Sequence, residues 1–470
     1  MLFYFSILFF LYSLLFQKSR IRFLIFLETI ILSFFFFSSV DPFIGMPIYI
    51  YFSIISILFS VSRIINGRNN KLIILGFFLS VGMLVQIFFL LLGLNNPKVL
   101  LLNQSNTDVF FDITSQLKTP VLDINVVKHF CFFLIFIVFL IANSDFFNPF
   151  DKKRMWSVIL KFYYLFIVFL IIQSILVNII GVNQHDATAF IRIVFSLQEG
   201  VAEYSAFGIK SCQAWLQEPS AIIMIMPLFC YVYRRSTLTW KEFILLVLGV
   251  LVCFLSTSTT GIVISLVFFF LIFMKTILSK TYTTFVYRLL FGFLIISVLI
   301  VCALNFQSVF EKVIDFISLK TNYNSAGFRS RSLVLAVQAF VQSPILGIGI
   351  GTVYCHGMVI QVLANIGILG FCLSILFFLR SMKLQIKKKS LFLACVSLVI
   401  FCFSGLVQYF TSPYMIPVMI GLFDISILDD LLVVKKEAAV AKIRGYNGFV
   451  SPKLRKKEVL YEGERREPES

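Results

Sequence analysis

Long apolar runs separated by charged loops constrain this chain more than any other feature of its sequence. The 470 residues are 59% hydrophobic and 13% charged, and the mean hydropathy is +0.96. A soluble domain is about 45–50% apolar and about 25% charged. The runs approach the roughly 20 residues that cross a bilayer, and they are too many for one buried core. The sequence therefore predicts an all-α polytopic membrane protein with about 12–13 transmembrane helices. We expect the spans near residues 2–16, 23–40, 47–61, 72–94, 129–142, 158–181, 220–233, 243–256, 260–274, 289–304, 357–379, 391–409 and 414–428.

The loops between these runs alternate in charge. The loops near residues 18–22, 63–71, 145–161, 234–242, 275–288 and 380–389 hold 21 Lys/Arg against three acids, whereas the other loops hold nine against ten. The positive-inside rule then predicts that the first set and the C-terminus are cytoplasmic. This distribution accounts for the net charge of +17 without any nucleic-acid partner. We expect the basic tail to meet anionic lipid headgroups.

This topology predicts a transmembrane domain over residues 1–430 with large extracytoplasmic loops at about 95–128, 182–219 and 305–356. Residues 431–470 are polar and charge-rich, so we expect a basic cytoplasmic tail that is partly disordered. The chain contains no nucleotide-binding glycine loop, which argues against ATP-driven transport. Its nine cysteines include no C-x-x-C pair, and the sequence predicts no metal site.

Two arginines, Arg329 and Arg331, follow the polar stretch 322–327, which predicts a turn. The planar guanidinium binds phosphate through two hydrogen bonds and keeps its charge. At a membrane edge, two arginines would suit a lipid-linked pyrophosphate. The alternative is that they only reach toward lipid headgroups.

A glycine-rich segment follows the arginines. Gly347 and Gly349 permit positive φ and close backbone approach, which is typical of a ligand-binding turn but also of a plain loop before a helix. His356 follows and directly precedes a long apolar run. A histidine can accept a proton near neutral pH, although it can equally be an interfacial polar residue.

An outward segment upstream holds further candidates. Glu218 precedes Pro219, and this order is typical of a helix start, where the acid is favoured by the helix dipole. The same carboxylate could instead bind sugar hydroxyls or act as a base. Trp215 could be an interfacial anchor or a sugar-stacking face. Arg192 and Lys210 in the same loop would add positive charge.

The order of these motifs resembles the O-antigen polymerase (Wzy-type) and O-antigen ligase superfamily. The resemblance covers about residues 210–428. The motifs that carry it are Glu218-Pro219-Ser220, the polar break Ser256–Gly261, Arg329 and Arg331, Ser343–Gly349, and His356 followed by Gly367 and Gly370. Where the family often has Asn after the histidine and Glu nine residues beyond it, this chain has Gly357 and Asn365. This departure weakens the assignment of His356 as a base and favours the polymerase branch.

The resemblance implies a GT-C-like membrane enzyme in the bacterial inner membrane. It implies metal-independent, inverting transfer of a glycan from undecaprenyl pyrophosphate, with no cofactor. Arg329 and Arg331 would bind the pyrophosphate, and Glu218 or His356 would orient or deprotonate the acceptor hydroxyl. The implied partners are lipid-linked oligosaccharides, membrane lipids, a chain-length regulator and a flippase.

Three functions follow as hypotheses. The first is a polymerase for O-antigen, capsule or exopolysaccharide that joins undecaprenyl-pyrophosphate-linked repeat units on the outer face of the membrane. The second is a ligase that transfers finished glycan to lipid A core. The third, from another class, is a flippase or transporter of the lipid-linked oligosaccharide. Transporters tend to show related halves and mid-membrane charges, and the sequence shows neither clearly.

Overall fold

A computed structural model describes the chain over part of its length. It describes residues 18–35, 46–65, 70–93, 101–102, 117–118, 122–183, 186–187, 205–206, 209–212, 214, 219–235, 238–278, 289, 292–293, 311, 324–353, 355, 357–384, 395–396, 399 and 412–423. All of them belong to the first of two compact units, Met1–Asp424. The second unit, Ile425–Ser470, lies outside the described residues, and so does the predicted tail.

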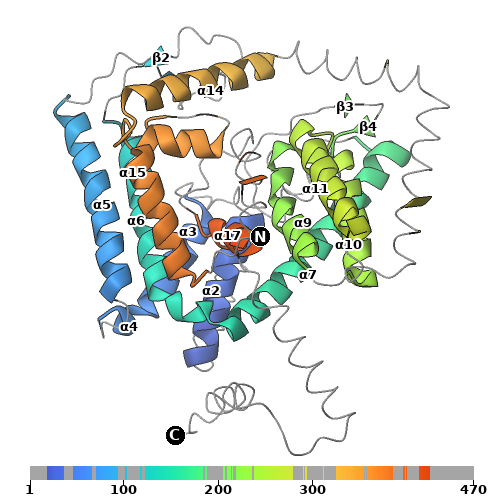
Figure 1. The fold of residues 1–470 in the computed structure, drawn as a ribbon, viewed down its shortest axis with the longest axis horizontal. Coiled ribbons are helices and arrows are strands. Elements are labelled where there is room, and N and C mark those ends of the chain that lie inside the picture. The colour runs from blue at the N-terminus through green and yellow to red at the C-terminus, as the bar shows by residue number, and fades with distance from the viewer. Residues whose placement is uncertain are drawn as a thin grey trace, which may run out of the picture. The chain divides into compact units, whose positions relative to one another are not determined.

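The described residues are mostly helical (Figure 1). The α-helices are α2 (Lys18–Phe35), α3 (Ile48–Leu58), α4 (Val61–Ile65), α5 (Asn70–Leu91), α6 (Ile124–Ala142), α7 (Pro149–Ser174), α9 (Met226–Arg234), α10 (Trp240–Leu255), α11 (Thr259–Leu278), α14 (Asn324–Gln342), α15 (Met358–Ser381) and α17 (Met415–Phe423). Two short 3₁₀ segments, η2 (Ser144–Phe147) and η4 (Pro219–Ile225), and one π-helical turn, η3 (Ile175–Ile179), adjoin them. Two antiparallel ribbons pair β1 (Leu101–Leu102) with β2 (Leu117–Lys118), and β3 (Ser205–Ala206) with β4 (Ile209–Lys210).

Four helical segments in the described part of the chain are long and apolar enough to cross a membrane. They are α5, α7 continued through η3, α11 and α15. Shorter apolar helices cover Ile48–Leu58, Val126–Ala142 and Ile222–Arg234. The expected helical membrane protein is thus confirmed at this level.

Helix α5 illustrates how such a segment divides its surface. Its buried residues recur every three or four positions and form one face: Leu72, Gly76, Leu79, Met83, Gln86 and Leu90. The other faces expose large apolar side chains, among them Phe77, Phe78, Val85, Phe88 and Leu91. A helix that is apolar all round but buried on one side only is suited to contact with lipid.

Local sequence signals fix several helix starts. Asp123 precedes α6, and its carboxylate accepts a hydrogen bond from the amide of Ile124. The Asn148 side chain caps α7 by accepting from the amide of Asp151, with Pro149 at the first helical position. Helix α10 begins with a capping box formed by Thr239 and Glu242.

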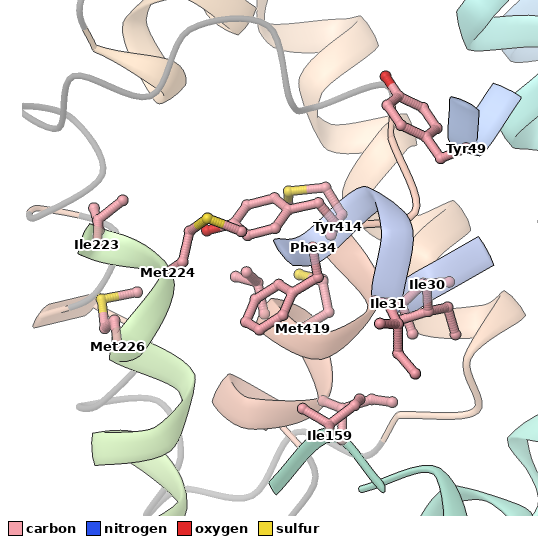
Figure 2. Close-up of a cluster of buried hydrophobic side chains, with 14 of the residues drawn as sticks. Ile30, Ile31, Phe34, Tyr49, Ile159, Ile223, Met224, Met226, Tyr414 and Met419 are labelled. Atoms are coloured by element: carbon pink, nitrogen blue, oxygen red, sulfur yellow. The ribbon is translucent and has the colours of Figure 1, made fainter. Parts of the chain in front are cut away.

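Helices α5, α6 and α15 lie side by side, and α7, α9, α10 and α11 pack together (Figure 1). Helix α17 contacts both α9 and α2. Figure 2 shows the buried side chains where these elements meet. The Phe34 ring stacks on Tyr414 at 5.3 Å and meets Tyr163 edge-on, also at 5.3 Å. The Tyr163 hydroxyl donates to the carbonyl of Met224 at 2.6 Å, which satisfies a polar group inside this apolar core.

Four cations of the predicted basic loops, which the structure places near helix ends, bind carbonyl groups at the ends of neighbouring helices. Arg22 donates to the carbonyl of Ala142, Lys152 to Lys383, Arg234 to Gly421 and Lys275 to Arg235, at 2.6–3.2 Å. The last carbonyls of a helix lack intrahelical donors and carry the negative end of its dipole, so a cation stabilises them. Arg22 also forms a two-bond ion pair with Asp145 at 2.8 and 3.0 Å. These cations therefore stabilise the packing of the helices in addition to contributing positive charge.

The hydrogen bonds of these four cations join helix ends that adjoin basic loops. The glycine-rich segment instead contacts α5 near its C-terminal end, away from the basic loop that precedes the helix. Gln86, in the second half of that helix, donates to the carbonyl of Leu346. Helix ends next to basic loops thus contact one another, as the alternation of basic and less basic loops along the sequence predicts. Which end faces the cytoplasm stays a prediction of the charge count.

Candidate functional site

Helix α14 carries the two predicted arginines. The sequence predicted a turn over residues 322–327, but the structure places Asn324 to Gly327 in the first turn of this helix. The turn prediction was wrong because tertiary packing outweighs the low helix propensity of Asn, Ser and Gly. Ser332, Ala336 and Ala339 are fully buried on one face of α14, which packs against α15.

Arg331 stands on the exposed side of α14. It forms no hydrogen bond, ion pair or ring contact with any residue that the structure describes. The side chain of Arg329 lies outside the described residues, although its backbone is helical. Positions two apart on an α-helix are separated by about 200°, so positions 329 and 331 do not share a face. Arg331 is therefore the better-placed anion ligand of the two.

The segment after α14, which we call the glycine loop (residues 343–353), packs into a break in α15. The backbone of Gly367 has φ 65° and ψ −178°, which interrupts the helix. This break separates two pairs of groups that an unbroken helix would join: the carbonyls of Ala364 and Asn365, and the amides of Ile368 and Leu369. A long apolar helix was expected here, and its interruption was not.

The glycine loop satisfies all four of these groups. The amides of Ile348 and Gly349 donate to the carbonyls of Ala364 and Asn365, at 2.9 and 3.0 Å. In return, the amides of Ile368 and Leu369 donate to the carbonyls of Pro344 and Ile345, at 2.8 and 3.2 Å. Backbone irregularity in a membrane protein requires such partners, because no water satisfies it there.

Glycine is required at this contact because the two backbones almost touch. A Cβ atom on Gly347 would lie 2.5 Å from the carbonyl carbon of Asn365, and one on Gly367 would overlap the carbonyl oxygen of Ile345. Gly347, Gly349 and Gly367 all have positive φ. The amides of Gly347 and Gly349 are already bonded to carbonyls, and both residues are buried. Direct substrate binding by these glycines stays a prediction, and their hydrogen bonds favour a structural role.

Asn365 closes the contact, a role that the sequence reasoning missed. Its side-chain oxygen accepts from the amide of Val353 at 3.0 Å, and its side-chain nitrogen donates to the carbonyls of Val353 and Gln361 at 3.1 and 2.8 Å. The signal available in the sequence was a polar residue two positions before a glycine in an apolar run. Its hydrogen bonds fix the far end of the glycine loop.

Neighbouring helices support the same loop. A Cβ on Gly349 would meet Leu90 of α5 at 2.5 Å, and one on Gly351 would meet His129 of α6 at 2.8 Å. His129 was not among the predicted site residues. The glycine loop is therefore held between α5, α6 and α15, directly after the helix that presents Arg331.

A second polar region surrounds the serine–threonine turn (residues 256–260), where α10 meets α11. Ser211 donates through its hydroxyl to the carbonyl of Ser256 at 2.7 Å, and the amide of Cys212 donates to Leu255 at 3.0 Å. The predicted binding residue Lys210 is exposed next to this turn. Its amide donates to the side chain of Asn178 at 2.7 Å, and its carbonyl accepts from the same side chain at 3.2 Å.

This second region contains several uncommon conformations. Ala214 and Thr257 adopt positive φ values of 48° and 49° without being glycine. The amide of Ala214 donates to the Gln173 side chain at 2.7 Å. The π-helical turn η3 carries Asn178. The Thr257 hydroxyl is buried and has no hydrogen-bond partner among the described residues. Such outliers gather at functional sites more often than elsewhere.

Cys212 lies in the same region but is not suited to nucleophilic chemistry. Burial raises the pKa of its thiol to about 11, although hydrogen bonds with Ser174 and Asn178 act in the opposite direction. The thiolate is the nucleophilic form of cysteine, and it is scarce at neutral pH with such a pKa. We assign Cys212 a packing role.

Four predicted residues, Glu218, His356, Arg192 and Trp215, lie outside the described residues. The description resumes at Pro219 and at Gly357, directly after the two candidate bases. Pro219 begins η4, as the sequence order predicted.

Within the described ranges, no group of three His, Cys, Asp or Glu residues could hold a metal ion. The structure presents one exposed arginine on α14, a glycine loop packed against the buried face of that helix, and a separate strained polar turn. Comparison with models of protein families, with curated proteins and with solved structures gave no match to this chain.

Proposed function

We propose that this protein is a polysaccharide polymerase of the bacterial inner membrane. It would join undecaprenyl-pyrophosphate-linked oligosaccharide repeat units on the outer face, with a GT-C-like architecture. The observation that carries the proposal is Arg331, an exposed cation without a described partner on α14, a helix that packs against the candidate span α15. An unpaired arginine in such a place favours an anionic ligand that the membrane itself delivers.

The chemistry needs little more than charge and position. The acceptor hydroxyl attacks the anomeric carbon of the donor sugar, the bond from that carbon to the pyrophosphate oxygen breaks, and undecaprenyl pyrophosphate leaves. Arg331 stabilises the negative charge that develops on the leaving group. Glu218 or His356 accepts the proton of the hydroxyl. No metal or nucleotide enters this scheme.

The glycine loop contributes rigidity to the proposed site. Helix α14 packs against α15, and the loop that follows is fixed to the break in α15 by four backbone hydrogen bonds. An electrostatic catalyst works best when its charges need no rearrangement during the reaction. This arrangement supports a fixed position for Arg331.

Asn365 bears on the choice between polymerase and ligase. It stands where the family that the sequence resembles often has a glutamate, and both polar atoms of its side chain are bonded to backbone groups. It therefore offers neither a carboxylate nor a free amide to a substrate. This supports the polymerase over the ligase.

The test uses the purified protein in lipid nanodiscs together with lipid-linked repeat units extracted from a deletion strain of the source organism. We expect products that grow by the mass of one repeat unit. Arg331→Ala should reduce the rate by about 10²–10³-fold, as removal of one preorganised transition-state donor does. The matched control is Arg380→Ala, which removes another exposed arginine, in the last turn of α15, and should leave the rate unchanged.

Other outcomes would replace this proposal. Transfer of a glycan to lipid A core without chain growth would indicate a ligase. Movement of labelled lipid carrier across vesicles containing this protein alone would indicate a flippase. Full polymerisation by the Arg331→Ala variant would remove the pyrophosphate role of Arg331.

A further inference from the structure

The exposed surface of α14 is itself divided into two strips. Successive residues of an α-helix are about 100° apart, so positions 334, 337 and 341 share one side and positions 331, 338 and 342 share another. The first strip consists of Val334, Val337 and Val341; the second consists of Arg331, Gln338 and Gln342. All six residues are exposed. The buried face of Ser332, Ala336 and Ala339 lies on the remaining side.

The valine strip continues onto a surface that is suited to lipid. Beyond the end of α14, Ile345 and Leu346 are exposed by 63% and 39%. The carbonyl of Leu346 accepts a hydrogen bond from Gln86 of α5, a candidate membrane span with large exposed apolar side chains. Gln86 lies five residues before the end of α5, roughly 7–8 Å along its axis. The end of the valine strip is thus level with the last turns of α5.

We propose that α14 is an interfacial helix that lies in the outer leaflet of the membrane. Its valine strip contacts phospholipid acyl chains, and Arg331, Gln338 and Gln342 lie at the level of the headgroups. Contact of the exposed valines with water costs hydrophobic free energy. A helix with apolar and polar strips is stable in the plane of an interface. Long cationic side chains reach the headgroup phosphates from such a position.

This proposal does not depend on the reaction that the protein catalyses. Helix α14 is not among the candidate membrane spans, so contact with the bilayer would have to be at its surface. The end of its valine strip is level with the last turns of the candidate span α5, which favours lipid over a protein partner as the occupant. A consequence is that Arg331 would lie at the depth where the pyrophosphate of any lipid-linked substrate is found.

The test measures the depth of each strip in full-length protein in phospholipid nanodiscs. A genetically encoded fluorescent amino acid replaces Val337 or Val341 and, as matched controls on the same helix turns, Gln338 or Gln342. We expect quenching by phospholipids brominated in their acyl chains at the two valine positions, with loss of quenching by aqueous iodide. At the two glutamine positions we expect the iodide quenching to persist.

Equal quenching by iodide at all four positions would place α14 in water and overturn the proposal. Protection of the valine positions from both quenchers would mean that protein covers the strip, which also overturns the proposal.

The wild-type protein allows a second measurement without substitutions. A phospholipid with a photoreactive group in its acyl chain should label peptides of α14 and α5 but not of α17, whose described side chains are buried. Labelling of α5 without α14 would contradict the proposal.

Discussion

The glycine loop and the serine–threonine turn both interrupt apolar helical structure, but they do so in different ways. Where the glycine loop meets the break in α15, Gly347 and Gly367 supply the positive φ values, and the backbone groups of Ala364, Asn365, Ile368 and Leu369 that the break separates all have partners. At the serine–threonine turn and the segment beside it, Thr257 and Ala214 adopt positive φ instead, and a buried hydroxyl has no described partner. The first region is built for rigidity, whereas the second retains strain of about 1–2 kcal/mol per residue.

This difference indicates separate roles. A strain-free contact suits the support of a fixed charge such as Arg331. A strained and incompletely bonded turn suits a segment that rearranges when a ligand arrives.

The largest effect is expected for Gly367→Ala. The new Cβ would overlap the carbonyl oxygen of Ile345, and alanine resists the positive φ at this position. We expect a loss of stability of about 3–5 kcal/mol from the combined overlap and strain. The measurement is the apparent melting temperature in detergent, followed by size-exclusion chromatography.

Gly82→Ala is the matched control for this substitution. Gly82 is an exposed glycine inside α5, and a Cβ there would meet nothing within 4 Å. Because alanine favours the helix over glycine, this variant should gain about 0.5–1 kcal/mol. Equal melting temperatures for the two variants would contradict the close contact between the glycine loop and α15.

An intermediate effect is expected for Asn365→Ala. The substitution leaves the amide of Val353 and the carbonyls of Val353 and Gln361 without this partner. Unsatisfied buried groups of this kind cost about 1–3 kcal/mol. The same unfolding assay measures the loss, and Gln338→Ala on the exposed surface of α14 should change the melting temperature little. A neutral Asn365→Ala would show that the side chain does not hold the loop.

The apolar runs of the sequence predicted several of the described helices near their observed bounds, because burial in lipid or protein requires such runs. Helix α5, for instance, was expected at 72–94 and lies at Asn70–Leu91. The break at Gly367 was not predicted, because a single glycine in an apolar run is compatible with a continuous helix. Only the approach of the glycine loop, from about 20 residues earlier in the chain, makes the break favourable.

The candidate site was predictable in part. Charge and position predicted Arg331 as an anion ligand; the structure shows that it is exposed, and the ligand role stays a prediction. The separation of positions 329 and 331 around the helix axis was missed, because residues 322–327 read as a turn. The roles of Asn365 and Thr257 depend on contacts between distant segments, which composition and spacing do not encode.

The smallest effect, and the one that best separates the two regions, is expected for Thr257→Gly. Glycine adopts the φ of 49° without strain and removes a buried hydroxyl that lacks a described partner, while it adds backbone entropy to the unfolded chain. These terms should leave a net gain of about 1 kcal/mol. If the strain serves the reaction, activity should fall although stability rises, as happens when a strained functional site is relaxed. The comparison is measured as melting temperature and polymerisation rate on the same preparation, with Thr257→Ser as the control that keeps both the strain and the hydroxyl. A gain in stability with unchanged activity would make the strained turn a tolerated irregularity of the fold, and a loss of stability would show that the hydroxyl has a partner that holds it.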